Sequence, residues 1–449
     1  MSHAAGEPRP ATVAEAFANT ARALDQFSIE RIRVEGLSRS SRSGTRGERE
    51  AEQEEVRTLT EQAFMREFVF QSRPCVIVGA LEDWPAMRRW RDDAYLFDLD
   101  GHFARGRQGT AEAAAPPKDD ADALADASGP RPREREATDD VRRVTVALTP
   151  NGRADAVTYV THRGAPKAEA DASSAEDAVV TEKLFMCAAE VRATLPELYQ
   201  LLCANPAHPP VRPVFVDLRR PAPVVAYAQM QNNCLEVEYQ HLHGDISTAL
   251  DRFGERVFGG PHEAANVWFG TPASVSSMHQ DWVENLYAVV RGVKEFILIP
   301  PWEGAFVPKP ELPSAAFAVR REDGEGGEGG EGGYAFAGAP VRDGLTVPWM
   351  DVEFTPAAVE DAALLPANLR ERLHPLVAYV QPGEVLYLPA MWLHRVAQHA
   401  DEDDRRAREN PPADAQRPPL PLIAAVNYWY EMNFTNPAVV MLREFGLLL

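Results

Sequence analysis

The spacing of apolar positions changes part-way along the chain. Beyond residue 224, short runs rich in β-branched and aromatic residues recur, and most are bounded by Gly or Pro. They lie at residues 225–231, 265–269, 286–290, 296–299, 376–380, 385–388 and 423–430. Because most of the segments between them show no helical period, the pattern predicts a sandwich or barrel of antiparallel strands, so the chain is expected to be mainly β.

The first 224 residues show a mixed pattern. At residues 12–27, apolar positions recur at helical spacing and predict an amphipathic helix, whose role as a packing helix or as a contact in a homodimer stays open. The Ser/Arg-rich residues 38–49 indicate a flexible linker. Farther on we expect a helix ending near Phe70 and an apolar strand at residues 75–78. These features divide the chain into an N-terminal helix and linker (1–60), an α/β region that packs on the core (61–224) and a β-rich domain (225–449).

Four segments interrupt this pattern. Each is rich in Ala, Pro, Gly or charged residues and has no buried-face period; they are residues 106–142, 164–182, 323–333 and 401–419. Such composition predicts long disordered insertions at the surface. We therefore expect one catalytic unit carrying long loops, and not a string of modules.

Composition narrows the classes of partner. The formal net charge of −21 argues against nucleic-acid binding, which needs a basic surface, and suits a basic protein or peptide. No apolar run reaches the length of a signal peptide or the roughly 18 residues of a membrane span, so we expect no membrane partner and a cytoplasmic protein, with the nucleus as a further compartment. Four scattered cysteines indicate neither a zinc ribbon nor a disulfide framework.

Histidine and aspartate recur two residues apart at three places: His243/Asp245, His279/Asp281 and His399/Asp401. Chance explains one or two such triplets among 11 histidines in an acidic chain. On a strand, side chains at i and i+2 share a face, so only a triplet on a strand projects both ligands into a barrel. The third triplet opens an acidic run and is expected in water, and the first precedes a loop-like segment. The second lies among strands and is the predicted metal pair.

A further histidine completes the predicted metal site. His394 follows a turn at Pro382-Gly383 and a buried strand at residues 385–388, which would place its imidazole at the mouth of the barrel. Two histidines and one carboxylate form the facial triad that leaves three coordination positions open, unlike a closed structural zinc site. The alternative is that His394 is a packed core residue beside Trp392.

Lys294 is the candidate partner for an anionic ligand. It follows Arg291-Gly292, on the returning arm of an expected hairpin, 15 residues after His279. An ammonium inside a barrel would need an anion beside it. The alternative is an outward, solvated lysine.

Taken together, these residues resemble the small Jumonji-C hydroxylases. The resemblance is carried in order by RPCVI at 73–77 with WPA at 84–86, VALTPNG at 146–152 with ADAV at 154–157, YAQMQ at 227–231, ENLY at 284–287, GEVLYLPA at 383–390 and AVNYWYEM at 425–432. These blocks span most of the chain between the insertions. The resemblance implies a double-stranded β-helix (jelly-roll or cupin) core of the JmjC type with an N-terminal α/β elaboration.

The resemblance also implies a set of site residues. His279, Asp281 and His394 would hold Fe(II) as the catalytic centre. Lys294 and Tyr227 would bind the distal carboxylate of 2-oxoglutarate, and Asn285, Asn427 and Ser276 would line the same pocket; Ser276 stands where related enzymes usually have threonine. Gln229 and Gln231, which share a strand face with Tyr227, are candidate substrate contacts, and so is Trp282. Candidate walls of the pocket are Trp268, Trp282, Tyr287, Trp392 and Trp429.

The function implied is dioxygen-dependent hydroxylation of a protein, at carbon three of a lysine in a translation-factor GTPase of the developmentally regulated GTP-binding type. Three alternatives remain: N-methyl-lysine demethylation by the same oxidant, a histone-tail protease and a catalytically silent cupin-like binding module. The absence of an H-E-x-x-H or nucleophile motif weighs against a protease, and the complete set of ligands weighs against a silent module.

Overall fold

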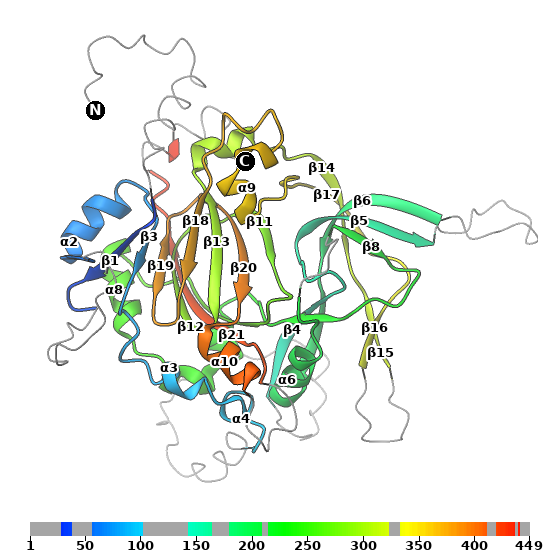
Figure 1. Cartoon of the computed structure of the whole chain (residues 1–449), viewed down its shortest axis with the longest axis horizontal. Coiled ribbons are helices and arrows are strands. Elements are labelled where there is room, and N and C mark those ends of the chain that lie inside the picture. The colour runs from blue at the N-terminus through cyan, green and yellow to red at the C-terminus, as the bar shows by residue number, and fades with distance from the viewer. Residues whose placement is uncertain are drawn as a thin grey trace, which may run out of the picture.

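Two β-sheets pack face to face at the centre of the molecule (Figure 1). The structure is a computed structural model, and it describes residues 28–37, 56–101, 142–163, 179–208, 214–322, 333–410, 419–435 and 439–440. The larger sheet has seven strands, in the order β10 (Ala264–Gly270), β21 (Ile423–Glu431), β12 (Val283–Arg291), β19 (Val385–Leu388), β3 (Cys75–Ile77), β1 (Glu30–Val34) and β2 (Arg57–Leu59). The smaller has four, in the order β11 (Ser276–Gln280), β20 (Leu393–His399), β13 (Val293–Ile299) and β18 (Leu376–Val380).

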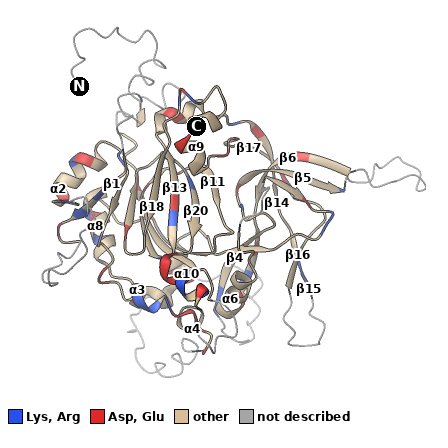
Figure 2. Ribbon diagram, viewed as in Figure 1, with Lys and Arg blue, Asp and Glu red and all other residues tan. Residues whose placement is uncertain are grey.

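The space between the two sheets holds a buried core of its own. Side chains from both sheets meet there, including Tyr287 and Val289 of β12 and Phe296 and Leu298 of β13. Alternate residues of a strand point to opposite faces, and both faces of β12 and β13 are buried, so each strand contains an unbroken apolar run, at residues 286–290 and 296–299. Figure 2 shows the barrel strands largely free of charged residues. A charge inside this barrel therefore needs a specific reason.

Further strands cover one end of the barrel, on the right in Figure 1. A five-stranded sheet runs β17 (Val341–Pro348), β14 (Glu311–Ala316), β6 (Val179–Cys187), β5 (Ala156–Arg163) and β8 (Phe215–Asp217). A three-stranded sheet runs β7 (Ala189–Thr194), β4 (Arg143–Thr149) and β9 (Val225–Tyr227), and a hairpin joins β15 (Val319–Glu322) to β16 (Gly333–Phe336). The loop between β4 and β5 reaches the barrel, where Val275 N donates to Gly152 O at 2.9 Å.

Short helices surround the sheets. They are α2 (Glu61–Phe64) with the π-helical turn η1 (Met65–Val69), α3 (Ala86–Arg89), α4 (Asp93–Leu96), α6 (Leu195–Cys203), α7 (Cys234–Val237), η3 (Gln240–Asp245), α8 (Ala249–Phe258), η4 (Pro301–Phe306), α9 (Pro356–Glu360), η5 (Ala362–Leu364) and α10 (Glu402–Glu409). α6 begins with a capping box in which Thr194 and Glu197 satisfy each other's backbone N–H groups. None of the helices in the described ranges has the length and apolar character to cross a bilayer.

Most of the predicted elements are confirmed. The seven apolar runs coincide with β9, β10, β12, β13, β18, β19 and β21, and the expected helix and strand around Phe70 are η1 and β3. The mainly β, two-sheet core agrees with the expected double-stranded β-helix. The predicted helix at 12–27 and linker at 38–49 lie outside the described residues, as do most of the segments 106–142 and 323–333. The division of the chain at residues 60 and 224 stays a prediction, and β1 and β2, which were not foreseen, extend the same sheet as β12.

Two of the predicted insertions are partly wrong. Residues 179–182 of the segment 164–182 begin β6, which pairs along its length with β5. Residues 402–409 of the segment 401–419 form α10, although their charge suggested a solvated loop. The expectation that Asp401 lies in water is also wrong, because it is buried, caps α10 by accepting from Asp404 N and accepts from Gly292 N at 2.9 Å.

A buried ion pair between Asp404 and Arg291 fixes α10 to the end of β12. Arg291, at the end of β12, donates to Asp404 at 2.9 Å and to Asp93 at 2.6 Å, and its side chain is only 3% exposed. It also donates to the carbonyls of Trp90 and Leu420. Every side of this guanidinium therefore meets an acceptor, as a buried charge requires.

Asp404→Ala should leave Arg291 with one carboxylate and destabilise the protein by about 3 kcal/mol, because removing one partner of a buried pair strands the other charge. Urea unfolding measures the change. Glu402→Gln on the same helix is the matched control, because Glu402 pairs with Arg406 at the surface with both side chains more than 60% exposed, so a change within about 0.5 kcal/mol is expected. Equal effects of the two substitutions would contradict the role given to Asp404.

Candidate metal and cosubstrate site

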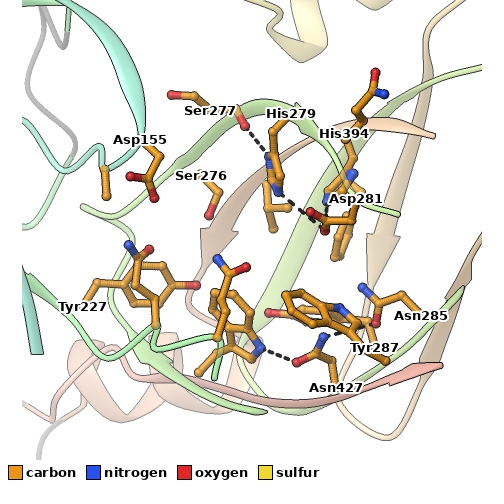
Figure 3. Close-up of a pocket in the computed structure, with 18 of the residues that line it drawn as sticks. Asp155, Tyr227, Ser276, Ser277, His279, Asp281, Asn285, Tyr287, His394 and Asn427 are labelled. Atoms are coloured by element: carbon orange, nitrogen blue, oxygen red, sulfur yellow. Dashed lines mark hydrogen bonds and ion pairs between the residues drawn. The ribbon is translucent and has the colours of Figure 1, made fainter. Parts of the chain in front are cut away.

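Three side chains converge at one end of the smaller sheet (Figure 3). His279 of β11 and His394 of β20 are directly opposite each other in the antiparallel register, and their ring centroids are 4.1 Å apart. Asp281 is two residues beyond His279; its Oδ2 lies 3.5 Å from His394 Nε2 and 3.9 Å from His279 Nε2. The ligand atoms of the three residues lie within 4.8 Å of one another, close enough to share one metal ion.

Backbone carbonyls orient both imidazoles. His279 Nδ1 donates to Ser277 O at 2.7 Å, and His394 Nδ1 donates to Trp392 O at 2.9 Å. A carbonyl can only accept, so in each ring the Nδ1 carries the proton and the Nε2 lone pair is free for a metal. The register of β11 and β20 shifts between Ser276 and His279, and this irregularity lies beside the carbonyl that orients His279.

Burial keeps His394 neutral. Its side chain is 5% exposed, and burial, with a smaller effect from His279, lowers its pKa to about 4. Asp281 opposes this shift but does not cancel it. A neutral imidazole is the form that binds a metal, so His394 stands ready to act as a ligand at neutral pH.

A cavity opens beside the triad and runs into the barrel. Its wall combines the triad with polar and aromatic side chains from the larger sheet and from the covering strands. Among the residues lining it are Tyr227, Trp268, Ser276, Asn285, Tyr287, Phe296, Asn427 and Trp429. The predicted cosubstrate residues Tyr227, Ser276, Asn285 and Asn427 are thus brought together with the metal ligands.

Lys294 lies behind Tyr227, one of the side chains that line this cavity. Its side chain is fully buried, so the alternative of an outward, solvated lysine is wrong. Nζ donates to Tyr227 Oη at 3.0 Å and to Gln398 Oε1 at 2.6 Å and lies over the Tyr227 and Tyr287 rings. Among the described residues, no carboxylate lies within ion-pairing distance of it. Burial lowers the pKa of Lys294 to about 7, which is the expected consequence of a cation without an anion.

Gln398 is a site residue that the sequence analysis missed. Its Nε2 donates to Thr271 O at 2.8 Å, so its Oε1 is turned toward Lys294. A Cβ on Gly270 would lie 2.4 Å from this Nε2 and 2.8 Å from the Tyr227 ring, so only glycine lets both partners of Lys294 stand where they do. A signal was present, because Gln398 is four residues after His394 and shares its strand face.

The two asparagines are tied to each other and to the wall. Asn427 accepts from Trp268 Nε1 at 2.8 Å and donates to Asn285 Oδ1 at 3.3 Å. Asn427 is fully buried, and Asn285 is nearly so. This chain holds polar groups at fixed positions beside the metal ligands, which a cavity needs if it is to orient a polar ligand.

The predicted substrate contacts separate into two groups. Gln229 and Gln231 line the cavity of the triad. Trp282 does not; it is 40% exposed, stacks on Phe434 and lines a neighbouring hollow that also reaches His279. Trp392 was a candidate wall, but its indole N–H donates to Ser72 O and the side chain lies outside the lining of the cavity.

The other two His-x-Asp triplets form no metal site in the described part of the chain. Asp245 is buried and accepts from Arg89, Trp90 and Tyr95. His243 instead donates from Nε2 to Leu235 O at 3.2 Å. His399 binds Glu295, and Asp401 caps α10. Only the triplet predicted from its place among strands joins a third ligand.

The donor set fits a divalent iron with a chelating acid. Two neutral imidazoles and one carboxylate suit non-haem Fe(II) and leave coordination positions open. The unpaired buried ammonium of Lys294 fits the far carboxylate of a dicarboxylic acid whose other end reaches the metal, because a bound anion would compensate the charge.

Comparison with known proteins agrees with this geometry. A family model described as a cupin-like domain matches residues 61–436. JmjC domain-containing protein E of Dictyostelium discoideum is 30% identical over 382 residues, covering 85% of this chain and 84% of that protein. Lysine-specific demethylase JMJ32 of Arabidopsis thaliana is 32% identical over 384 residues, covering 83% and 79%.

A human relative, named bifunctional peptidase and (3S)-lysyl hydroxylase JMJD7, is 27% identical over 371 residues, which cover 83% of this chain and 81% of that protein. The similarity thus extends over about four fifths of the length of each relative. Together with the metal triad inside a two-sheet β core, it shows that the chain belongs to the cupin-like JmjC family of 2-oxoglutarate oxygenases.

Proposed function

We propose that this protein is an Fe(II)- and 2-oxoglutarate-dependent hydroxylase that acts on carbon three of a lysine side chain in a protein. The observation that carries the proposal is the pairing of two features at one site, on either side of Tyr227. One is the triad His279, Asp281 and His394, and the other is the buried ammonium of Lys294, which has no carboxylate partner among the described residues. A silent binding module has no use for this combination.

When bound, Fe(II) and 2-oxoglutarate supply the oxidation: dioxygen is split, one oxygen atom converts 2-oxoglutarate to succinate and carbon dioxide, and the other enters a substrate C–H bond. The chain's own residues supply orientation. Lys294, with Tyr227 and Gln398, would hold the far carboxylate by charge-assisted hydrogen bonds, and the Asn285–Asn427 pair would fix polar groups beside the metal. Trp268, Tyr287 and Phe296 exclude water from the inner end of the cavity.

The choice of a lysine substrate rests on the relatives and on charge. Two relatives carry names of enzymes acting on lysine, one as a demethylase and one as a (3S)-lysyl hydroxylase. The net charge of −21 favours a basic segment as substrate. Within this proposal the protein partner is a translation-factor GTPase of the developmentally regulated GTP-binding type.

Demethylation of N-methyl-lysine is the second candidate, because the relative named as a demethylase is 32% identical to this chain. Mass spectrometry separates the two reactions. Incubated with Fe(II), 2-oxoglutarate and the GTPase or its lysine-containing peptides, the protein should add one oxygen atom, about 16 Da, to a lysine. Loss of about 14 Da from methyl-lysine peptides, with no addition to unmethylated ones, would replace hydroxylation by demethylation.

His279→Ala should lower succinate formation at least about 100-fold, because two remaining ligands hold the metal weakly. Metal binding, measured by calorimetry with Mn(II) in place of Fe(II), should fall with it. His399→Ala is the matched control. This histidine is the last residue of β20, the strand that carries His394, but it binds Glu295 outside the cavity. Unchanged metal binding in His279→Ala would refute the triad.

The affinity for 2-oxoglutarate should fall as pH rises. The far carboxylate needs protonated Lys294, and the pKa of free Lys294 is about 7. The dissociation constant should therefore be flat below pH 7 and rise by up to about tenfold per pH unit above it, until the pKa of the complex is reached. Calorimetry on anaerobic, Mn(II)-loaded protein between pH 6.5 and 9 measures this.

Lys294→Met is the control for that titration. It should bind 2-oxoglutarate about 30- to 100-fold more weakly at pH 6.5, because a charged hydrogen bond is lost, and the remaining affinity should not change with pH. An unmodified protein whose affinity stays constant up to pH 9 would show that Lys294 does not carry the binding.

A further inference from the structure

The loop between β4 and β5 is held firmly against the barrel. Gly152 has a φ of 73°, and a Cβ there would lie 2.0 Å from Ala273 O, so the backbone makes a contact that only glycine allows. Arg153 is buried and forms a two-point ion pair with Glu353, at 2.8 and 2.9 Å. The segment just before β5 is therefore rigidly placed.

Asp155 follows in this loop and lines the cavity of the triad. Its φ of 50° lies in the left-handed region, which aspartate tolerates at a cost of about 1 kcal/mol. Burial raises the pKa of its carboxyl, while hydrogen bonding to the Cys187 thiol opposes the shift. Across the described residues, neither Lys nor Arg lies within ion-pairing distance of this carboxylate. This strained, partly buried acid therefore has a thiol as a hydrogen-bond partner and no Lys or Arg to neutralise it.

Two charged groups of opposite sign, neither with a salt-bridge partner among the described residues, thus lie at this site. Lys294 lies behind Tyr227, to which it donates, and Asp155 lies on the cavity wall formed by the covering strands (Figure 3). In that view Asp155 lies beside Ser276, and His279 stands between Asp155 and the other two members of the triad. A second hollow, which shares Asp155, Gln229 and Gln231 with the first, continues past Cys187 to the exposed Glu190. This second hollow connects Asp155 with the surface of the protein.

We propose that Asp155 binds the ammonium of the substrate lysine and so directs the oxidation to the middle of the side chain. This inference rests on the proposed function. With Nζ held at Asp155, the carbon that faces the metal lies nearer the backbone; Cβ is four bonds from Nζ, about 5 Å in staggered geometry. A Cβ–H bond is broken and a C–OH bond is formed with the dioxygen and 2-oxoglutarate of the proposed reaction, while the ammonium keeps its protons.

The placement of Asp155 also separates the two candidate reactions. Demethylation requires the N-methyl carbon, one bond from Nζ, at the metal. A carboxylate on the wall away from Asp281 and His394 would draw Nζ away from that position. The same carboxylate is well placed for hydroxylation farther along the side chain, because the ammonium then serves as an anchor and takes no part in the chemistry.

The test measures which end of a lysine lies near the metal. The protein is loaded with Mn(II) and 2-oxoglutarate, and the probe is Nα-acetyl-L-lysine N-methylamide, followed by the paramagnetic relaxation of its protons in NMR. With the unmodified protein the Hβ protons should relax fastest and the Hε protons slowest. Asp155→Asn should weaken binding about tenfold or more and remove this gradient, because a charge-assisted hydrogen bond is lost.

Two controls belong to this experiment. Glu190→Gln removes the same charge from the neighbouring hollow and should leave the gradient intact. The neutral norleucine analogue of the probe, which has no ammonium, should bind the unmodified protein about tenfold or more weakly than the lysine probe binds it. That second comparison needs no variant, so it holds even if Asp155→Asn fails to fold.

The outcomes are distinct. Four results would each overturn the role of Asp155. In the unmodified protein these are fastest relaxation at Hε, or no relaxation of the probe although Mn(II) is bound. In the variants they are an unchanged gradient in Asp155→Asn, or a loss of the gradient in Glu190→Gln equal to that in Asp155→Asn. None of these results would touch the proposed function, which is read from succinate and from the mass added to a lysine. Failure to bind Mn(II) at all would instead remove the proposed function, and the role of Asp155 with it.

Discussion

The register between β11 and β20 is the constraint on which the site depends. Because His279 and His394 are directly opposite in antiparallel strands, their side chains leave the sheet on the same face, and Asp281 follows at the spacing that returns to that face. A slip of one residue would turn one histidine to the other side of the sheet. The two faces of the smaller sheet pack into different cores, so such a slip would also move the apolar side chains of β13 and β20 out of the core that each one fits.

Given this register, the other features of the site stabilise polar and charged side chains inside the buried barrel. In the triad, backbone carbonyls accept the Nδ1–H of each imidazole, which leaves Nε2 turned toward the metal position. Lys294 has two neutral acceptors and two aromatic rings, which compensate an ammonium only in part. The lowered pKa of Lys294 reflects the stabilisation that its charge still lacks, and the carboxylate of a bound dicarboxylic acid would supply that stabilisation. Buried charge is thus least compensated where the cosubstrate would bind, and this distinguishes a binding site from a hydrophobic core.

Local patterns predicted the parts of this site that repeat along one strand. His279 and Asp281 were separable from two similar triplets because strands flank them, and His394 followed a recognisable buried strand. Gln398 was missed although it continues the alternation of His394, since a glutamine near the end of a strand ordinarily faces water. Asp155 and Gly270 act only through contacts with residues more than 30 positions away or on other strands, and no local pattern contains those contacts. The charged run at 401–409 misled for the same reason: its buried partner, Arg291, lies 113 residues earlier than Asp404.

That last error has a functional side. Arg291 and Gly292 form the turn from β12 into β13, and Lys294 is the second residue of the strand that follows. α10 and its N-cap bind this turn at two points: Asp404 pairs with Arg291, and Asp401 accepts the backbone N–H of Gly292. A Cβ on Gly292 would meet Ile423 at 2.5 Å, so the turn also packs tightly against β21. The depth of Lys294 in the barrel is therefore set from outside, by a charged helix that touches neither the metal ligands nor the cavity. A segment with the composition of a surface loop becomes part of the site because it fixes where β13 begins.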